Sequence, residues 1–359
     1  MTARILKPTR ENILLCAQTL KKGGVIGMPT ETVYGLAGNA TDSDSLTKIY
    51  LTKERPTFDP LIVHVSLEKA TFADLMREQL IYPHELSDEA VKRIDLLIRK
   101  FWPGPLTLVL PKSDLVSDLA TSGLDFVAIR MPKHPVALEL IRTFGLPVCA
   151  PSANRFGKIS PTSAEDVEEE LGDRIDLILD GGECEVGLES TILKVMEDGD
   201  LVLLRPGAIT REEIMEATQA PVAVITGGKN PHGPQMASGM SSSHYSPDKK
   251  LIMLPMPLSQ MMSPPQLGQS LPKKIALLVM KGKAEDAAVI LSELLETEVI
   301  AETLSESGDW AEAGKTLFKK LRALDASDAD LILCEPCTET KGIGYAVADR
   351  LMRASAPKK

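Results

Sequence analysis

Short apolar runs alternate with helical patterns between residues 25 and 210. Most of the runs end in Gly, Pro, Ser or Asn, at which loops commonly begin. This alternation is typical of an α/β fold, in which strands and helices follow one another along the chain. The Asp198-Gly199 pair predicts a tight turn between two strand arms. The predicted strands are residues 25–28, 61–65, 106–110, 126–130, 147–150 and 175–179 and the two arms that flank residues 197–199.

Helical periodicity marks several segments between these strands. Apolar residues at helical spacing predict a helix over residues 91–101. A second helix starts at Thr162-Ser163 and stops at Gly172, since glycine commonly follows a helix end. A third follows Thr210, where Glu213 completes a capping box.

The composition changes after residue 225. Residues 226–247 are rich in Gly, Ser and Pro and have no apolar period, which predicts a linker or mobile loop. A second Pro-rich and Met-rich stretch covers residues 251–272. Beyond it, strands and helices alternate again and predict a small, Rossmann-like βαβαβα domain. Its predicted elements are strands 275–280, 298–301 and 330–335 and helices over 284–295, around 317–324 and near 345–352.

Composition and charge limit the classes of function. The chain has 359 residues and a net charge of −10, which argues against a generic binder of polyanions. Its length predicts about two domains. No apolar run approaches the roughly 20 residues that span a bilayer, and the charged start lacks the apolar stretch of a signal peptide. With five scattered cysteines, we expect a cytoplasmic protein with reduced thiols and no membrane association.

Hydroxyl, amide and cationic side chains recur in the loops where strands are predicted to end. Such loops commonly hold ligands in α/β sheets, and cations together with hydroxyls suit phosphate oxygens. His64, which closes the apolar run LIVHV, is either a strand-end core histidine or a member of this set. The set consists of Thr30, Thr32, Lys53, Arg55, Arg130, Ser152, Asn154, Ser160, Ser190 and Arg205.

Other motifs do not support a different chemistry. Gly314-Lys315-Thr316 resembles the end of a P-loop, but Asp309 stands where that motif needs glycine, and the tripeptide lies in an amphipathic helical pattern. Cys334 and Cys337 have the spacing of a redox or zinc pair, but no second pair exists, so we expect ordinary thiols. The sequence contains no nucleophile elbow and no dinucleotide fingerprint. The remaining chemistry is the positioning of phosphates and the stabilisation of charge, as in nucleotidyl transfer.

Seven motifs in order resemble those of the YrdC family, over about residues 23–207. The segments 239–247, 317–336 and 342–351 resemble the carboxy-terminal extension of the two-domain threonylcarbamoyl-AMP synthases. The seven motifs are PTETVYGL (29–36), KERP with DPLIVH (53–64), FWPGPLTLVLP (101–111), AIRMPKHP (128–135), APSAN with SPT (150–162), GLESTI (187–192) and LLRPG (203–207).

The resemblance implies a fold, a reaction and a division of the chain. The fold is a twisted, mostly parallel sheet around a large concave cavity. The reaction converts L-threonine, bicarbonate and ATP, with Mg²⁺ on the phosphates, into threonylcarbamoyl-AMP and pyrophosphate. A separate transferase complex then uses the product to form N6-threonylcarbamoyladenosine in tRNA. We therefore expect a catalytic domain over residues 1–215, a linker that folds over the cavity as a lid over 216–250, and the small domain over 251–359.

The family motifs also imply roles for single residues, although they name no metal ligand and no base for the threonine amine. Lys53 and Arg55 are the expected catalytic cations, which stabilise charge on the α-phosphate and on departing pyrophosphate. The expected threonine-binding residues are Thr32, His64, Arg130 and Ser190. The expected ATP-binding residues are Lys53, Arg55, Asp59, Ser152, Asn154, Ser160, Arg205 and Ser243.

The sequence departs from the family pattern at several positions. Asp59 stands where the family usually has Asn. This predicts a carboxylate near the phosphates, and we expect Mg²⁺ or Lys53 to offset its negative charge. Phe126 and Ala150 stand where Thr is frequent, so hydroxyl contacts are lost there. Residues 241–243 are serines where some relatives have basic residues. Ser243 can therefore contact phosphate through its hydroxyl but not through a positive charge.

Three other functions remain open at this stage. The first is an RNA-binding module, although the net charge and the lack of interleaved basic and aromatic residues disfavour stable nucleic-acid binding. The second is carbamoyl-adenylate chemistry on another acceptor, as in the YrdC-like domains of hydrogenase-maturation carbamoyltransferases. The third is a scaffold whose small domain binds the later transferase.

Overall fold

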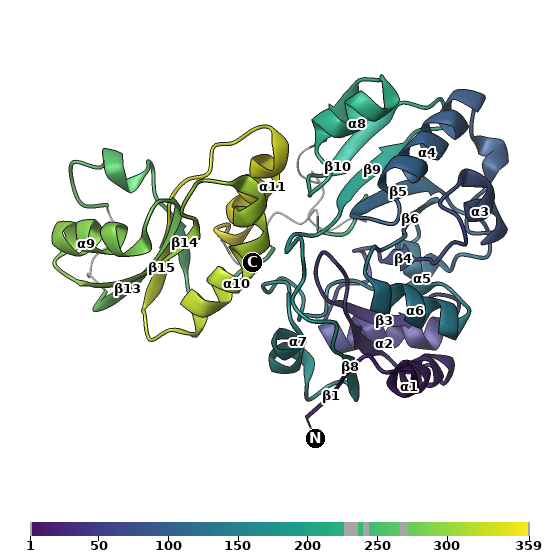
Figure 1. Ribbon diagram of the computed structural model, residues 1–359, viewed down its shortest axis with the longest axis horizontal. Helices are drawn as coiled ribbons and strands as arrows, with labels where there is room; N and C mark the ends of the chain where they lie inside the picture. Colours follow the sequence, from purple (N-terminus) through teal and green to yellow (C-terminus); the bar gives the residue numbers. More distant parts are fainter. Residues whose placement is uncertain (1, 226–235, 240–243, 266–271, 358–359) are drawn as a thin grey trace. The chain divides into compact units, whose positions relative to one another are not determined.

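The computed structural model describes residues 2–225, 236–239, 244–265 and 272–357. The chain forms two compact units (Figure 1). The first comprises Met1–Phe156 and Ser160–Ser242, and the second comprises Gly157–Ile159 and Ser243–Lys359. The domain boundaries expected at residues 215 and 250 stay predictions.

The first unit mostly alternates strands and helices along its length. Its strands are β1 (Arg4–Leu6), β2 (Ile26–Met28), β3 (Gly35–Asn39), β4 (Ile62–His64), β5 (Leu106–Pro111), β6 (Phe126–Arg130), β7 (Val148–Cys149), β8 (Leu177–Leu179), β9 (Thr191–Val195), β10 (Leu201–Arg205) and β11 (Val222–Val224). Its helices are α1 (Arg10–Lys21), α2 (Ser43–Lys53), α3 (Phe72–Arg77), the 3₁₀ helix η1 (Pro83–Glu85), α4 (Asp88–Phe101), α5 (Asp118–Thr121), α6 (Pro135–Phe144), α7 (Ala164–Leu171) and α8 (Arg211–Thr218).

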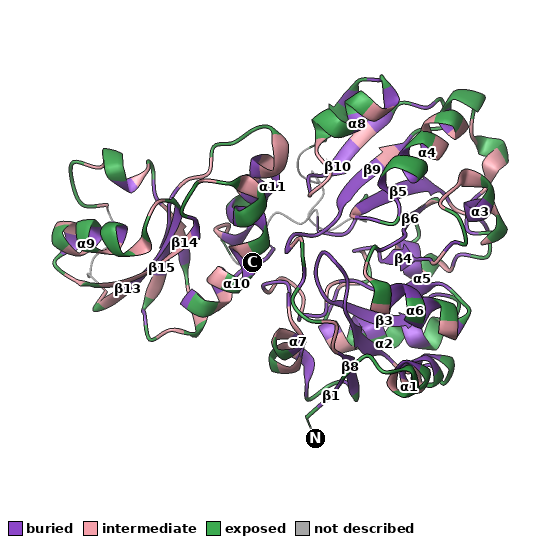
Figure 2. Ribbon diagram, in the orientation of Figure 1, coloured by how far each residue is buried: buried purple, intermediate pink, exposed green. Residues whose placement is uncertain are grey.

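The described strands of this unit form one 11-stranded sheet in the order β1-β8-β2-β3-β7-β4-β6-β5-β9-β10-β11. The strands are mostly buried, whereas helices such as α1 and α4 expose one face (Figure 2). One part of the core lies where α1 and α6 pack on β1, β2 and β8 and includes Leu20, Ile26 and Phe144. Because the strand ends are packed from several sides, side chains at those ends are held in place.

The small sheet lies in the second unit and is parallel throughout, in the order β12-β15-β13-β14. The elements of this unit are β12 (Leu251–Met253), the 3₁₀ helix η2 (Leu258–Gln260), β13 (Lys274–Lys281), α9 (Ala284–Leu295), β14 (Glu298–Ser305), α10 (Trp310–Ala326), β15 (Leu331–Cys334) and α11 (Gly342–Ala354). The expected Rossmann-like βαβαβα order is confirmed, with β12 added at one edge.

The expected α/β class is confirmed. Across both sheets, eight neighbouring pairs are parallel and five are antiparallel. The large sheet by itself is mixed, with five pairs of each kind, because hairpins such as β9-β10 interrupt its parallel strands. The concave cavity expected with this fold stays a prediction.

Local sequence signals explain several element ends. Ser163 and Asp166 form a capping box at the start of α7, and Thr210 and Glu213 form one at the start of α8, as predicted for α8. Gly314-Lys315-Thr316 lies inside α10 and is no P-loop. The cysteines are free thiols, as expected. None of the helices in the described part of the chain is long and apolar enough to cross a membrane.

One expectation is wrong in detail. The segment that begins at Lys53 is expected to be a strand-end loop, but Lys53 is the last residue of helix α2. No element is predicted for the stretch 251–272, which begins with strand β12 and contains η2. In both segments, tertiary pairing or packing stabilises an element that has little periodicity of its own.

Candidate active site

Four of the expected site residues lie at the ends of neighbouring strands in the first unit. His64 ends β4 and Arg130 ends β6, and these parallel strands pair with the two residues in register. Arg205 ends β10, and Ser190 directly precedes β9. Strand ends are where α/β folds collect ligand-binding side chains, so the sheet topology brings these residues to one region.

Arg130 is the centre of a first group and is only 3% exposed. Its Nη1 donates a hydrogen bond to Thr32 Oγ1 at 2.8 Å, and its Nε donates to the Gly104 carbonyl at 3.2 Å. Thr32 Oγ1 in turn lies 2.9 Å from Thr30 Oγ1. These two hydrogen bonds hold the guanidinium through neutral oxygens, so they leave its positive charge available to a carboxylate.

Glu31 is a buried carboxylate beside Arg130 that the sequence analysis missed. Its Oε1 lies 2.7 Å from Arg130 Nη2. The angle falls outside hydrogen-bond geometry, and neither carboxylate oxygen has a hydrogen-bond partner among the described residues. A ligand on Arg130 therefore meets a positive and a negative charge together, which favours a zwitterion such as an amino acid over a simple anion. The signal was present, because Glu31 lies between two threonines of the candidate set.

His64 is buried beside this group, in register with Arg130. Burial, and secondarily the Arg130 charge, lower the pKa of the His64 imidazole from 6.5 to about 3. Its Nδ1 lies 3.1 Å from the Ile62 carbonyl. His64 is therefore neutral at physiological pH and offers a polar contact without adding charge.

Ser190 connects this region to Arg205. Its Oγ lies 2.7 Å from Thr107 Oγ1 and accepts a hydrogen bond from Arg205 Nη2 at 3.1 Å. Arg205 Nε also donates to the Ser190 carbonyl at 3.1 Å. Thr107 is a second buried polar residue that the sequence analysis missed, since its place in the apolar strand β5 gave no signal.

Lys53 lies in a second group and is 1% exposed. Its Nζ donates hydrogen bonds to the carbonyls of Ser152 and Asn154, in the loop that follows β7. Burial, and secondarily the nearby Arg55 charge, hold the pKa of Lys53 well below its usual range. An added phosphate would stabilise the charged amine, so the environment of Lys53 favours an anionic ligand.

Arg55 and Asp59 form a buried ion pair, with 3.0 Å between Arg55 Nη2 and Asp59 Oδ2. Arg55 Nε donates to the Asp59 carbonyl at 3.0 Å, and Nη2 donates to the Pro60 carbonyl at 2.8 Å. Burial raises the pKa of Asp59, and Arg55, Lys53 and Arg205 oppose that rise in this order. Among the protein's own cations, Arg55 therefore offsets the carboxylate charge most, ahead of Lys53, whereas Mg²⁺ or Lys53 was expected in this role.

Residues 236–239 contact both arginines from within the first unit. Ser238 Oγ accepts a hydrogen bond from Arg55 Nη2 at 3.1 Å, and its carbonyl accepts one from Arg205 Nη1 at 3.1 Å. The Gly239 backbone N–H faces Asp59 and lowers the pKa of that carboxyl. Part of the expected lid segment therefore lies on the cations expected to hold phosphates.

The remaining expected residues lie on the loop after β7. Ser160 Oγ donates to Glu189 Oε1 at 2.5 Å, which makes Glu189 another buried polar neighbour that the sequence analysis missed. Asn154 is 1% exposed, and its Nδ2 donates to the Arg155 carbonyl at 2.7 Å. Ser152 is half-buried. Ser243 lies outside the described residues.

The side chains of this region offer few ligands for a magnesium ion. No cluster of three or more His, Cys, Asp or Glu side chains that could hold a metal occurs among the residues that the structure describes. Asp59 is a buried carboxylate without a hydrogen-bond partner there. Because Mg²⁺ in nucleotide sites is commonly held by phosphates and one or two carboxylates, this set fits an ion carried by ATP, with Asp59 as the candidate protein ligand.

Comparisons with known proteins give the family. The family model described as "Telomere recombination" matches residues 18–207, and the one described as "Threonylcarbamoyl-AMP synthase, C-terminal domain" matches residues 209–356. The threonylcarbamoyl-AMP synthase of Pyrococcus abyssi is 39% identical over 345 residues, which cover 96% of this chain and 94% of the relative. The protein of the same name from Bacillus subtilis is 39% identical over 347 residues, with 96% and 92% covered.

A solved structure agrees with these relatives. The crystal structure of P. abyssi Sua5 complexed with L-threonine is similar with a TM-score of 0.81 and 36% identity, and 98% of each chain is covered. The similarity thus includes both units of this chain. The chain belongs to the Sua5/YciO/YrdC family, in the two-domain form with the threonylcarbamoyl-AMP synthase C-terminal domain.

Proposed function

We propose that this chain is an L-threonylcarbamoyladenylate synthase that forms threonylcarbamoyl-AMP and pyrophosphate from L-threonine, bicarbonate and ATP. The observation that carries the proposal is the buried Arg130–Glu31 pair beside Thr32, in a chain whose full-length relatives are named threonylcarbamoyl-AMP synthase. The paired charges suit an amino acid, and the cations Lys53 and Arg55 suit a nucleotide. The enzyme is then a nucleotidyltransferase.

The proposal assigns threonine to Arg130, Thr32, His64 and Ser190. Arg130 pairs with the α-carboxylate, and the Glu31 carboxylate favours the amino end of the same molecule by charge. Neutral His64 and Ser190 offer hydrogen bonds to the remaining polar atoms. What supports this assignment is that the four side chains are buried, Thr32 in the turn between β2 and β3 and the other three at neighbouring strand ends, where water competes little for the ligand.

The proposal assigns ATP to the second group of residues. Lys53 and Arg55 stabilise negative charge on the α-phosphate and on the departing pyrophosphate. Asp59 holds the Arg55 guanidinium in position through their ion pair at 3.0 Å. The other proposed contacts to the nucleotide come from Ser152, Asn154, Ser160, Arg205 and Ser243.

The bond changes define what these residues must do. The threonine nitrogen, after losing a proton, bonds to the carbon that comes from bicarbonate, and water is the by-product of this carboxylation. A carbamate oxygen then bonds to the α-phosphorus while the α–β bond breaks and pyrophosphate leaves. When bound with ATP, Mg²⁺ neutralises phosphate charge. Arg55 and Lys53 act on the leaving group, whereas Arg130 orients the nucleophile.

Lid closure, product transfer and location complete the proposal. Residues 216–250 are proposed as the lid that shields the carbamate and the mixed anhydride from water. The contacts of Ser238 with Arg55 and Arg205 support this role, because they put the segment on the phosphate-binding cations. We also propose that the cytoplasmic product passes to the tRNA threonylcarbamoyl transferase complex.

The test is pyrophosphate release from ATP in the presence of bicarbonate. L-threonine is compared with L-serine, L-alanine and no amino acid, and each reaction is repeated without bicarbonate. Release that requires both threonine and bicarbonate is the expected result. Release without an amino acid, or no release under any condition, would overturn the proposal, and carbamoyl phosphate and tRNA would be the next ligands to test.

A further inference from the structure

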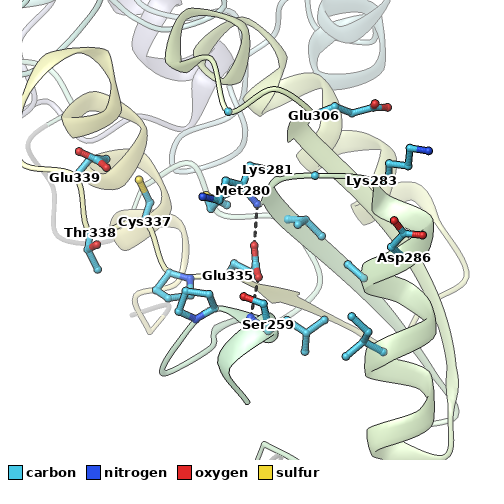
Figure 3. A pocket seen from close by; sticks show the side chains of 18 of the residues that line it. Ser259, Met280, Lys281, Lys283, Asp286, Glu306, Glu335, Cys337, Thr338 and Glu339 are labelled. Carbon is cyan, nitrogen blue, oxygen red and sulfur yellow. Dashed lines mark hydrogen bonds between the residues drawn. The ribbon is translucent and has the colours of Figure 1, made fainter. Parts of the chain in front are cut away.

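The second unit contains a cavity that the proposed reaction does not use. Its volume is about 700 Å³, within the range of roughly 300–1,000 Å³ typical of small-molecule sites. The lining comes from the end of β13, from the loops after β13, β14 and β15, from the first turns of α9 and from residues 257–259 (Figure 3). The cavity therefore lies at the carboxyl ends of three adjacent parallel strands.

The position of the cavity coincides with a reversal in the order of the strands. The chain passes from β13 through α9 to β14 on one side, and then through α10 to β15 on the other side of β13. The loops after β13 and β15 consequently diverge at the edge of the sheet. In open parallel sheets, ligands bind at the carboxyl ends of the strands where the strand order reverses. Topology alone thus favours a ligand at this cavity.

The loop after β13 suits a phosphate. Lys281 ends β13, Gly282 has a φ of +85°, and Lys283 precedes the 12-residue helix α9. No side chain caps the start of α9, and no atom lies within 4 Å of a Cβ built on Gly282. Both lysines are exposed and form no ion pair among the described residues. Two cations and a helix start thus face open space at one end of the cavity.

An acidic side chain lies where a ribose would follow. Glu306 comes directly after β14 and follows Gly282 by 24 residues. Its carbonyl accepts a hydrogen bond from Gly282 N–H at 3.1 Å, which holds the two loops together. In βαβ nucleotide-binding units, an acidic residue about 20 residues after the glycine turn bonds the ribose hydroxyls. The second unit has this arrangement without the three-glycine fingerprint.

The other lining residues limit the size and charge of the ligand. Glu335 accepts hydrogen bonds from Leu258 N–H at 2.8 Å and Met280 N–H at 3.1 Å (Figure 3). Its carboxylate thus holds two walls of the cavity together and is already engaged by backbone donors. Asp286 and Glu339 add two further negative charges to the lining. Because only two lysines stand beside these carboxylates, the positive charge of the lining suits a ligand with one phosphate better than a triphosphate.

Trp310 supplies an aromatic face for a base. It lies at the start of α10, is half-buried and lines the cavity. Stacking on an aromatic side chain tolerates any base. We propose that this cavity binds a nucleoside monophosphate, with the phosphate on the Lys281–Lys283 turn, the ribose on Glu306 and the base against Trp310.

Tryptophan fluorescence of the full chain provides the test. The chain has two tryptophans, Trp310 at the cavity and Trp102 in the first unit. A Trp310→Phe variant shows whether a fluorescence change comes from Trp310. AMP, GMP, inorganic phosphate and adenosine are titrated separately. The Lys281→Ala/Lys283→Ala variant is compared with Lys315→Ala, which removes an exposed lysine of α10 outside the cavity lining.

We expect AMP and GMP to change the Trp310 signal. Loss of both lysines should weaken AMP binding by about tenfold or more, whereas Lys315→Ala should change it by less than about twofold. Glu306→Ala should weaken AMP more than 2′-deoxy-AMP. The signal should persist in Arg55→Ala, which disables the proposed ATP site. No signal change, a change that is independent of both lysines, loss of the signal in Arg55→Ala, or an equal response to phosphate or adenosine alone would overturn the proposal.

Discussion

Arg55 and Arg130 are both buried, but their neighbours differ. Arg55 is paired with Asp59 and contacts Ser238, whereas Arg130 contacts Thr32 and lies beside Glu31. The first set of neighbours contains a candidate metal ligand and part of the proposed lid. The second set has the mixed charge that suits an amino acid. The two arginines are therefore expected to act at different stages of the reaction.

Alanine variants of these arginines should separate the two roles. Arg55→Ala should lower kcat by roughly 10²–10³-fold, because it removes a donor that stabilises charge in the transition state. Arg130→Ala should raise the KM for threonine by roughly tenfold or more, because it removes a charged partner of the substrate. Steady-state pyrophosphate release measures both parameters. Equal effects on kcat and KM in both variants would contradict the assignment.

His64 should make folding sensitive to acid. Its folded pKa of about 3 lies below the ordinary 6.5, so between these values the unfolded chain binds the extra proton and stability falls as the pH is lowered. The slope from this residue is about 1.4 kcal/mol per pH unit near pH 5. Urea unfolding at pH 4.5, 5.5 and 6.5 should show a shallower pH dependence for His64→Gln.

A matched control for this measurement is His84→Gln, which removes an exposed histidine. The control should retain the pH dependence of the unsubstituted chain. If His64→Gln also retained it, the imidazole of His64 would exchange protons equally in the folded and unfolded chain, and its neutral role in the site would be wrong.

At the scale of elements, the packing of α2 on β3 determines where Lys53 lies. Lys53 ends α2, and Gly38 of β3 faces this helix. A Cβ at Gly38 would lie 2.8 Å from Ser45 Oγ and 2.9 Å from Ile49 Cδ1, which is closer than real contacts. Glycine is thus needed here for close approach of a strand and a helix.

Gly38→Ala should therefore push α2 away from the sheet. We expect a loss of about 1–3 kcal/mol in the free energy of unfolding, together with a higher KM for ATP because Lys53 moves with the helix. Urea unfolding and pyrophosphate release measure the two effects. Ile49→Val removes the clashing Cδ1, so the double variant should be more stable than the sum of the single effects predicts. If the losses in unfolding free energy of the two single variants simply added in the double variant, the Ile49 side chain would not be what clashes with the new Cβ.

At the scale of the whole molecule, the proposed lid segment has contacts in each unit. Ser238 contacts Arg55 and Arg205 in the first unit. Tyr245, in the second unit, stacks on Phe318 with ring centroids 5.5 Å apart and lies under the Arg350 guanidinium. We therefore expect the second unit to anchor the lid, rather than only to stabilise the chain.

Deletion of residues 251–359 should test this role. Removing Phe318 and Arg350 frees Tyr245, so pyrophosphate release should fall by roughly tenfold or more because the site no longer closes. Trp102 fluorescence during urea unfolding checks that the first unit stays folded. Full activity in the shortened chain would refute the anchoring role.

The sequence by itself determined the α/β class, most strand positions and the identity of the main site residues. Alternating apolar runs and helix caps are local signals, and ordered motifs such as residues 29–36 and 128–135 carry the family pattern. The sequence missed β1, β3, β11 and β12, which are short strands that depend on their neighbours for hydrogen bonds. Local propensity is a weak guide for such edge or glycine-rich segments.

Only the tertiary structure decided the electrostatics of the candidate site and the second cavity. Glu31 beside Arg130, Arg55 as the first partner of Asp59, and Glu306 held to Gly282 all join residues whose pairing has no periodic signal. The pKa of His64 likewise depends on burial by surrounding strands. These properties come from distances and solvent exclusion, which arise when separate segments pack together and which a linear pattern does not encode.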